Sequence, residues 1–150
     1  MAKKNKTRRV SAAIATAMPA VIVIASAAEA NTMKIRITLN GKAITATLID
    51  SETTRDFISL LPLTLTMNDL FGREKFGHLP RAISEGGKRT RTYEVGDVIC
   101  WSPGPDVAVF YRHDGPSIPS PGIIVMGKID SGVEALNVPG SVKVTIELIK

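Results

Sequence analysis

The sequence predicts a mainly β domain, folded as a closed barrel or a sandwich of about eight short strands. Three observations support this prediction. From Thr32 onward, apolar residues recur mainly at every second position. Turns rich in Gly and Pro separate the apolar runs, and only two short segments have helical character. Of the two architectures, the closed barrel leaves a small β protein with no exposed sheet edge.

The first two strands are expected to form an antiparallel hairpin. The runs Ile35–Leu39 and Ile44–Leu48 both alternate apolar and polar residues. Asn40-Gly41 lies between them. This dipeptide is a strong hairpin signal, because both central residues of a type I′ turn need a positive φ.

A short helix is predicted next, over Glu52–Leu60. Asp50-Ser51 offers capping side chains for its N-terminus, and Glu52 places negative charge in the first turn. Pro62 ends the helix, because a proline disfavours the α conformation of the residue before it. We expect this helix to cover an open end of the sheet.

The rest of the chain alternates strands and turns. Leu63–Met67 is a predicted strand, and Asn68–Pro80 is predicted to be a loop. One more helical turn is expected within Ser131–Leu136. The remaining predicted strands are Arg89–Tyr93, Val98–Trp101, Val107–Tyr111, Ile123–Ile129 and Val142–Ile149.

Residues 1–30 have the pattern of a secretory signal peptide. A basic start is followed by the apolar run Val10–Ala28 and by the small-x-small ending Ala28-Glu29-Ala30. We therefore expect an exported protein, periplasmic or extracellular, whose single domain is Asn31–Lys150. Arg8-Arg9 leaves twin-arginine export open as a route, and an uncleaved anchor is a second alternative. No later run is long and apolar enough to span a bilayer.

The basic character of the chain comes mostly from this leader. The sequence has 19 Lys+Arg and 14 Asp+Glu. Residues 1–30 hold five of the basic residues and one of the acidic residues, which leaves 14 basic and 13 acidic residues. A domain of net charge +1 gives no reason to expect a nucleic-acid partner.

Residues typical of catalytic, metal and cofactor sites are scarce. The chain has one Cys and two His, and no Cys-x-x-Cys or His-x-x-x-His, so no metal site is predicted. It also lacks a glycine-rich phosphate loop followed by Lys-Ser/Thr, and no cofactor is expected. Cys100 lies between Ile99 and Trp101 and is predicted to be a buried, unreactive side chain.

The densest mixture of charged and aromatic residues lies in Asp69–His78. One interpretation is a ligand-binding loop, in which Arg73 holds a carboxylate or carbonyl group and Glu74 orients Arg73. The other is a cover loop, whose apolar residues plug the barrel end while the charges are solvated. The basic run Lys88–Arg91 is interpreted as solvated charge at a strand edge, with an anionic ligand as the alternative.

Large apolar residues on the predicted strands belong either to the core or to the floor of a ligand groove. Together with the charged loop they give the following candidate ligand-binding residues: Arg73, Glu74, His78, Trp101, Phe110, Tyr111 and Met126.

Five short runs stand in a particular order and spacing. They are Thr54–Thr64 (TRDFISLLPLT), Asp69–Lys75 (DLFGREK), Tyr93–Val98 (YEVGDV), Trp101–Pro105 (WSPGP) and Val125–Ile129 (VMGKI). In this order they resemble a family of small prokaryotic cyclophilin-like proteins, and the resemblance covers nearly all of Met33–Lys150. It implies a closed, eight-stranded cyclophilin-like barrel with two short capping helices.

The resemblance does not by itself imply an activity, because function lies in the site and not in the fold. True cyclophilins are peptidyl-prolyl isomerases with a Phe-His-Arg motif, whose arginine polarises the prolyl carbonyl. This sequence has no Phe-His-Arg. The favoured hypothesis is a non-catalytic module that binds a peptide segment or a small molecule. The alternatives are a divergent isomerase that uses Arg73 or Arg112 from a new position, and an unrelated small-molecule enzyme.

Overall fold

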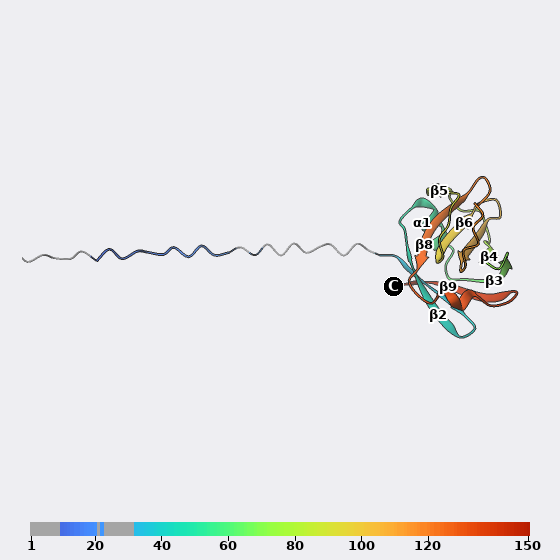
Figure 1. Ribbon diagram of the computed structural model, residues 1–150, viewed down its shortest axis with the longest axis horizontal. Helices are drawn as coiled ribbons and strands as arrows, with labels where there is room; N and C mark the ends of the chain where they lie inside the picture. The colour runs from blue at the N-terminus through green and yellow to red at the C-terminus, as the bar shows by residue number, and fades with distance from the viewer. Residues whose placement is uncertain (1–9, 21, 23–31) are drawn as a thin grey trace, which may run out of the picture.

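The computed structural model describes residues 10–20, 22 and 32–150, and all its helices and strands lie in the last range (Figure 1). Residues 10–20 and 22 are exposed and belong to no helix or strand. Most of the predicted leader, residues 1–30, lies outside the described residues and stays a prediction. No helix in the described ranges has the length and hydropathy needed to cross a membrane.

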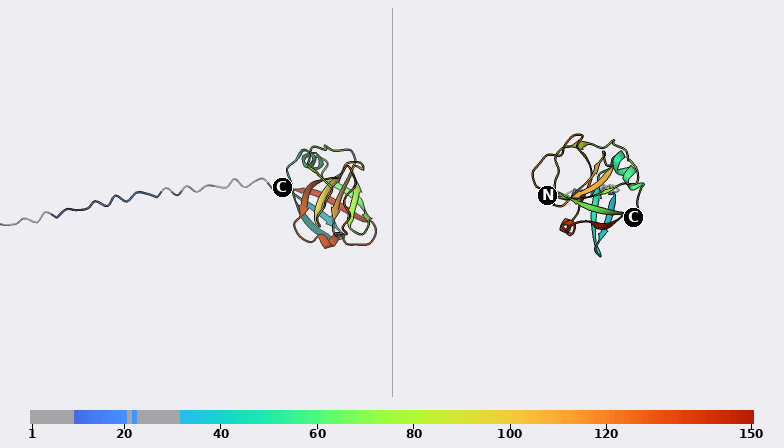
Figure 2. Two further views of the ribbon diagram at one scale, coloured as in Figure 1. Left: turned by 45° about the horizontal axis from the view of Figure 1, so that its top comes forward. Right: turned by 90° about the vertical axis from the view of Figure 1, so that its right-hand side faces the viewer.

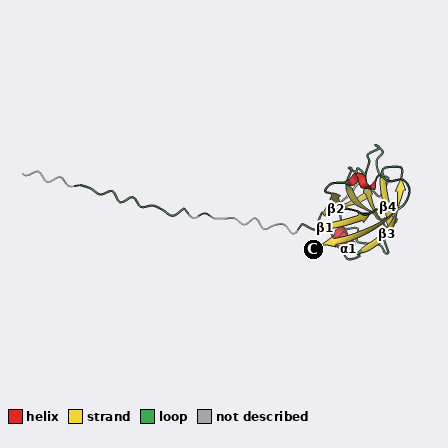
Figure 3. Ribbon diagram, turned by 90° about the horizontal axis from the view of Figure 1, so that it is seen from below, coloured by secondary structure: helices red, strands yellow, loops and turns green. Residues whose placement is uncertain are grey.

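Strands are the main regular secondary structure of the domain, as Figure 3 shows. Eight of them close into an antiparallel barrel in the order β1-β9-β3-β4-β7-β6-β8-β2, and the ninth, β5, pairs with β8 outside this ring. The predicted closed barrel is therefore confirmed. The strands described are β1 Lys34–Leu39, β2 Lys42–Leu48, β3 Leu63–Leu70, β4 Glu74–His78, β5 Arg89–Thr90, β6 Asp97–Trp101, β7 Asp106–Phe110, β8 Ile123–Ile129 and β9 Val142–Ile149.

Pairing of β2 with β8 closes the barrel. Ala46 lies opposite Ile129, and Leu48 lies opposite Gly127. The two strands approach so closely at this point that a Cβ atom on Gly127 would lie 2.5 Å from the carbonyl oxygen of Thr47. A glycine at position 127 therefore allows the contact that completes the ring.

The predicted β1–β2 hairpin is confirmed. Ile37 lies opposite Ile44, and Leu39 lies opposite Lys42. Asn40 has a φ of 47° and Gly41 a φ of 72°, as a type I′ turn requires.

Two short helical segments lie at opposite ends of the barrel (Figure 2). Helix α1, Glu52–Ile58, begins at Ser51, whose side chain accepts a hydrogen bond from the backbone N–H of Thr54. Its Phe57 is fully buried in the core. The second segment, η1 (Val133–Leu136), is a 3₁₀ turn that buries Leu136. The expected capping helices are thus one α-helix and one 3₁₀ turn.

The strands carry two apolar layers, because side chains of successive residues point to opposite faces. One layer fills the barrel interior and includes Cys100, which is buried as predicted. The other lies on the outer face of β6, β7 and β8 and is built around Ile99, Phe110 and Ile123. The segment 112–122, called the strap from here on, covers this outer layer with Ile118, which is buried.

The prediction of a loop over Asn68–Pro80 is wrong, because β3 and β4 form a hairpin there. Phe71 (φ 55°) and Gly72 (φ 61°) occupy the two left-handed positions of its turn. The Asp69 carboxylate accepts a hydrogen bond from the Gly72 N–H at 2.9 Å and so supports the turn. A bulky residue rarely adopts a positive φ, so Phe71-Gly72 carries none of the hairpin signal of Asn-Gly.

Lys75 is a fully buried charge on β4. Its Nζ donates to Asp69 Oδ1 at 3.0 Å and to the carbonyl oxygens of Val138 at 2.5 Å and Gly140 at 2.8 Å. These bonds connect the β3–β4 hairpin to the segment that leads into β9.

We predict that Lys75→Met lowers the free energy of unfolding by about 3–5 kcal/mol, because it removes the cation paired with Asp69 and the donor to two carbonyl groups. Urea denaturation followed by circular dichroism measures this loss. The matched variant Lys143→Met changes an exposed lysine on β9 and should stay within about 0.5 kcal/mol of the wild type. A loss below about 1 kcal/mol for Lys75→Met would contradict the assigned role.

Candidate functional site

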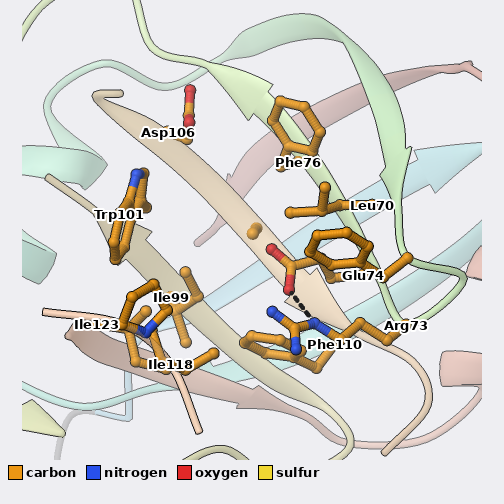
Figure 4. Close-up of a pocket in the computed structure, with 13 residues that line it drawn as sticks. Leu70, Arg73, Glu74, Phe76, Ile99, Trp101, Asp106, Phe110, Ile118 and Ile123 are labelled. Atoms are coloured by element: carbon orange, nitrogen blue, oxygen red, sulfur yellow. Dashed lines mark hydrogen bonds and ion pairs between the residues drawn. The ribbon is translucent and has the colours of Figure 1, made fainter. Parts of the chain in front are cut away.

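A cavity of about 190 Å³ lies between the outer face of the barrel and the strap (Figure 4). Its walls are mainly apolar, and three charged residues interrupt them. The residues lining it are Leu70, Phe71, Arg73, Glu74, Phe76, Ile99, Trp101, Asp106, Ala108, Phe110, Ile118, Pro119 and Ile123.

Strand alternation places the cavity walls outside the barrel. On β7, Ala108 and Phe110 face the cavity, while Val107 and Val109 point into the barrel interior. The same alternation along β6 turns Ile99 and Trp101 outward. A period of two thus divides each of these strands between the core and the candidate site.

The strap forms one wall of the cavity through Ile118 and Pro119, and hydrogen bonds hold it there. Ile118 donates its backbone N–H to the carbonyl of Arg91 at 2.8 Å, and Arg91 Nε donates back to the Ile118 carbonyl at 2.8 Å. Nearer the start of the strap, Asp114 accepts a hydrogen bond from the Tyr93 hydroxyl at 2.7 Å. The basic run 88–91 therefore supplies a strap contact through Arg91, while Arg89 pairs with Glu85.

Arg73 and Glu74 form a buried ion pair in the cavity wall. Arg73 Nε lies 2.9 Å from Glu74 Oε2, and their side chains are 8% and 9% exposed. Arg73 Nη1 also lies 3.5 Å from Asp114 Oδ1. The guanidinium packs among aromatic rings, 5.3 Å from the ring centres of Phe71 and Tyr93.

Burial sets the electrostatics of this pair. It raises the pKa of the Glu74 carboxyl, and the hydrogen bond and charge of Arg73 offset this only in part. At the more exposed Asp114, the Tyr93 hydroxyl hydrogen bond lowers the pKa, and the positive charge of Arg73 adds to the effect.

A second carboxylate, Asp106, lies toward another side of the cavity from Glu74, near Trp101 (Figure 4). Asp106 is 8% exposed, and its Oδ1 pairs with Nδ1 of His78. The His78 side chain is itself 72% exposed and does not line the cavity. His78 therefore contacts Asp106 from solvent and not from within the cavity.

The structure brings four of the seven predicted site residues into the lining of one cavity: Arg73, Glu74, Trp101 and Phe110. His78 joins them indirectly, through Asp106. Met126 and Tyr111 do not line the cavity. Met126 is fully buried in the barrel interior, and Tyr111 packs against the interior cluster and donates its hydroxyl to Asp69 at 2.5 Å.

Several cavity residues were not predicted as ligand-binding. Ile99, Ala108 and Ile123 lie on predicted strands, but their sequence pattern does not say which face is covered by a second layer. Asp106 directly follows Pro103-Gly104-Pro105, and no sequence motif assigns it a role. Ile118 is the single large apolar residue in the Pro/Gly/Ser-rich strap, and this was a signal that could have identified it as a buried anchor.

Within the described part of the chain, no group of three or more His, Cys, Asp or Glu side chains is placed to hold a metal ion. Burial raises the pKa of the Cys100 thiol to about 11. A thiol with this pKa is protonated at neutral pH and is a poor nucleophile. The side chains that line the cavity offer hydrogen bonds and apolar contact.

The fold and the cavity define a closed antiparallel β-barrel with a small apolar site on its outer face. The model of the cyclophilin-like family matches residues 37–147, and the chain belongs to this family. The resemblance inferred from the five ordered runs is thereby confirmed.

A solved structure is similar to this one in fold. It is the solution structure of a hypothetical protein from Archaeoglobus fulgidus, which superposes with a TM-score of 0.62 at 22% sequence identity. The match covers 77% of this chain and 94% of that chain. The comparison with curated proteins gives no match.

The raised pKa of Glu74 predicts a pH dependence of stability. A carboxyl whose pKa is higher in the folded state contributes stability below its unfolded pKa of about 4.5, and loses it as the pH rises through the folded value. We expect the unfolding free energy of Glu74→Gln, relative to the wild type, to increase with pH across this window. Urea denaturation at a series of pH values measures the difference.

Glu134→Gln is the control for this experiment, because Glu134 is exposed on η1. Its stability should run parallel to that of the wild type across the same pH values. A relative stability of Glu74→Gln that stays flat or falls with pH would show that Glu74 titrates normally.

Proposed function

We propose that the outer cavity is a ligand-binding site, and that the domain is a non-catalytic module that binds an apolar group of a peptide segment or small molecule. One observation carries the proposal, namely an apolar cavity with a buried Arg73–Glu74 pair in its wall. Ligand sites in proteins combine mainly apolar walls with a few placed polar groups.

The size of the cavity supports recognition of a single group. An apolar cavity of about 150 Å³ is large enough for benzene, and pockets for drug-sized ligands run to about 300–1,000 Å³. A cavity of about 190 Å³ therefore suits one ring or one branched side chain. The rest of a larger ligand would lie outside it, along the strap.

Binding without catalysis is supported by the contacts of Arg73. An isomerase would need a donor directed at the prolyl carbonyl or nitrogen, but Nε and Nη1 of Arg73 already face Glu74 and Asp114 and hold the guanidinium in the cavity wall. Redirecting it would leave the buried Glu74 unpaired, which is costly. The other arginine considered, Arg112, is exposed and does not line the cavity.

Trp101 provides a direct test, because it lines the cavity and is the single tryptophan of the chain. We expect X-Pro peptides or small aromatic ligands to change its fluorescence saturably, without accelerating prolyl cis/trans exchange measured by NMR. Ala108→Leu should weaken this binding at least tenfold, because the added carbons fill the cavity. Overpacking costs about 1–3 kcal/mol, so folding of the variant is checked by circular dichroism.

The matched control is Ala82→Leu, which makes the same change at an exposed position. It should bind like the wild type. Accelerated exchange by the wild-type protein would establish the isomerase alternative. No change in Trp101 fluorescence with any ligand of either panel would contradict a binding role for the cavity.

Export is part of the same proposal and is supported by the leader pattern of residues 1–30. Full-length protein expressed in a Gram-negative host should reach the periplasm with its N-terminus at Asn31, as determined by mass spectrometry. Ala30→Arg should block cleavage, because the site needs a small residue there. Full-length protein in the membrane fraction of the wild type would instead indicate an uncleaved anchor, and cytoplasmic protein would contradict export.

A further inference from the structure

We infer that the outer cavity selects a protonated amine carried on a small apolar body, with the Glu74 carboxylate as the anchor for the ammonium group. This inference rests on the proposed function, because it specifies the ligand of the same cavity. Three features of the cavity lead to it: an unpaired carboxylate oxygen, the charge balance of the wall, and the aromatic rings.

The first feature is the free oxygen of Glu74. Oε2 accepts the hydrogen bond from Arg73, while Oε1 has no hydrogen-bond partner among the described residues. Figure 4 shows this second oxygen turned toward the cavity, away from the dashed bond. The side chain as a whole is only 9% exposed. An acceptor left in this position favours a ligand that donates a hydrogen bond.

The second feature is the charge of the wall. The lining residues include two carboxylates, Glu74 and Asp106, and one cation, Arg73. Asp114 competes with Glu74 for the charge of Arg73. The partner of Asp106 is His78, which is largely in solvent. The empty cavity therefore carries an excess of negative charge, which a cationic ligand would neutralise and an anionic ligand would increase.

The third feature is the set of aromatic rings around Glu74. Phe71, Phe76, Trp101 and Phe110 all line the cavity. Their faces attract cations, as Arg73 illustrates by lying 5.3 Å from the ring centre of Phe71 and 5.7 Å from that of Phe110. The same rings pack an apolar body, so one ligand can use both properties.

The residue that anchors the ligand is thus Glu74, whereas the sequence suggested Arg73. Arg73 was expected to hold a carboxylate or carbonyl, but two of its nitrogens already face acidic side chains. Its Nη2 makes no hydrogen bond to the described residues and remains available to a ligand carbonyl. An amide ligand is therefore the strongest competitor of the amine, and the experiment includes one.

The experiment compares four ligands of similar size that differ in their polar group: 2-phenylethylamine, 2-phenylethanol, phenylacetamide and phenylacetate. Each is titrated into the full chain, and binding is followed by Trp101 fluorescence at neutral pH. We expect the amine to bind at least tenfold more tightly than the alcohol and the amide. Phenylacetate should bind most weakly, because the lining has two carboxylates and a single cation, whose charge Glu74 and Asp114 already share.

Two variants identify the anchor. Glu74→Gln should remove most of the advantage of the amine over the alcohol, while alcohol binding changes less than threefold. Asp106→Asn leaves the Arg73–Glu74 pair intact and should weaken amine binding only two- to threefold. Glu134→Gln removes an equal charge on η1, outside the cavity, and should change neither affinity.

The outcomes separate this inference from the proposed function. Equal binding of amine, alcohol and amide, or tightest binding of phenylacetate, would overturn the inference and leave a binding site in place. If none of the four ligands and no X-Pro peptide changes Trp101 fluorescence, both are wrong. Should Glu74→Gln not fold, the ligand series on the wild type and on Asp106→Asn still decides the question.

Discussion

Closure of the barrel by β2 and β8 is the constraint on which the rest of the structure depends. The contact needs a glycine at position 127, because a side chain there would meet the carbonyl of Thr47. Once the ring is closed, one face of every strand is committed to the interior. The opposite face of β6, β7 and β8 is then left to a second apolar layer, and that layer forms the cavity.

The cavity wall contains buried charges, which lose free energy of solvation. The contacts of Arg73 and Glu74 offset part of that loss. Arg73 offsets part of the cost of burying Glu74, while Glu74, Asp114 and aromatic faces contact Arg73 in turn. Such a pair stabilises little by itself. The pair leaves Oε1 of Glu74 as an acceptor without a partner in the described structure. In our proposal this oxygen makes the apolar cavity selective for a protonated amine.

Local sequence signals predicted the elements whose geometry is decided locally. Asn40-Gly41 identified its hairpin because both residues tolerate a positive φ, and Ser51 identified the start of α1 through its side-chain oxygen. Phe71-Gly72 escaped prediction because a bulky residue rarely adopts a positive φ, although Phe71 has a φ of 55° in this turn. The prediction therefore ended the third strand at Met67 and left β4 inside a loop, where the chain forms a hairpin.

The sequence by itself determined most of the strands, the family and the presence of Arg73, Glu74, Trp101 and Phe110 in a candidate site. Only the tertiary structure decided which face of each strand lines the barrel interior and which lines the cavity. Phe110 and Tyr111 are neighbours in sequence, yet a one-residue step along a strand reverses the direction of the side chain, so Phe110 lines the cavity and Tyr111 packs toward the interior. Met126 lies inside for the same reason, since the outer layer becomes a site only where the strap covers it.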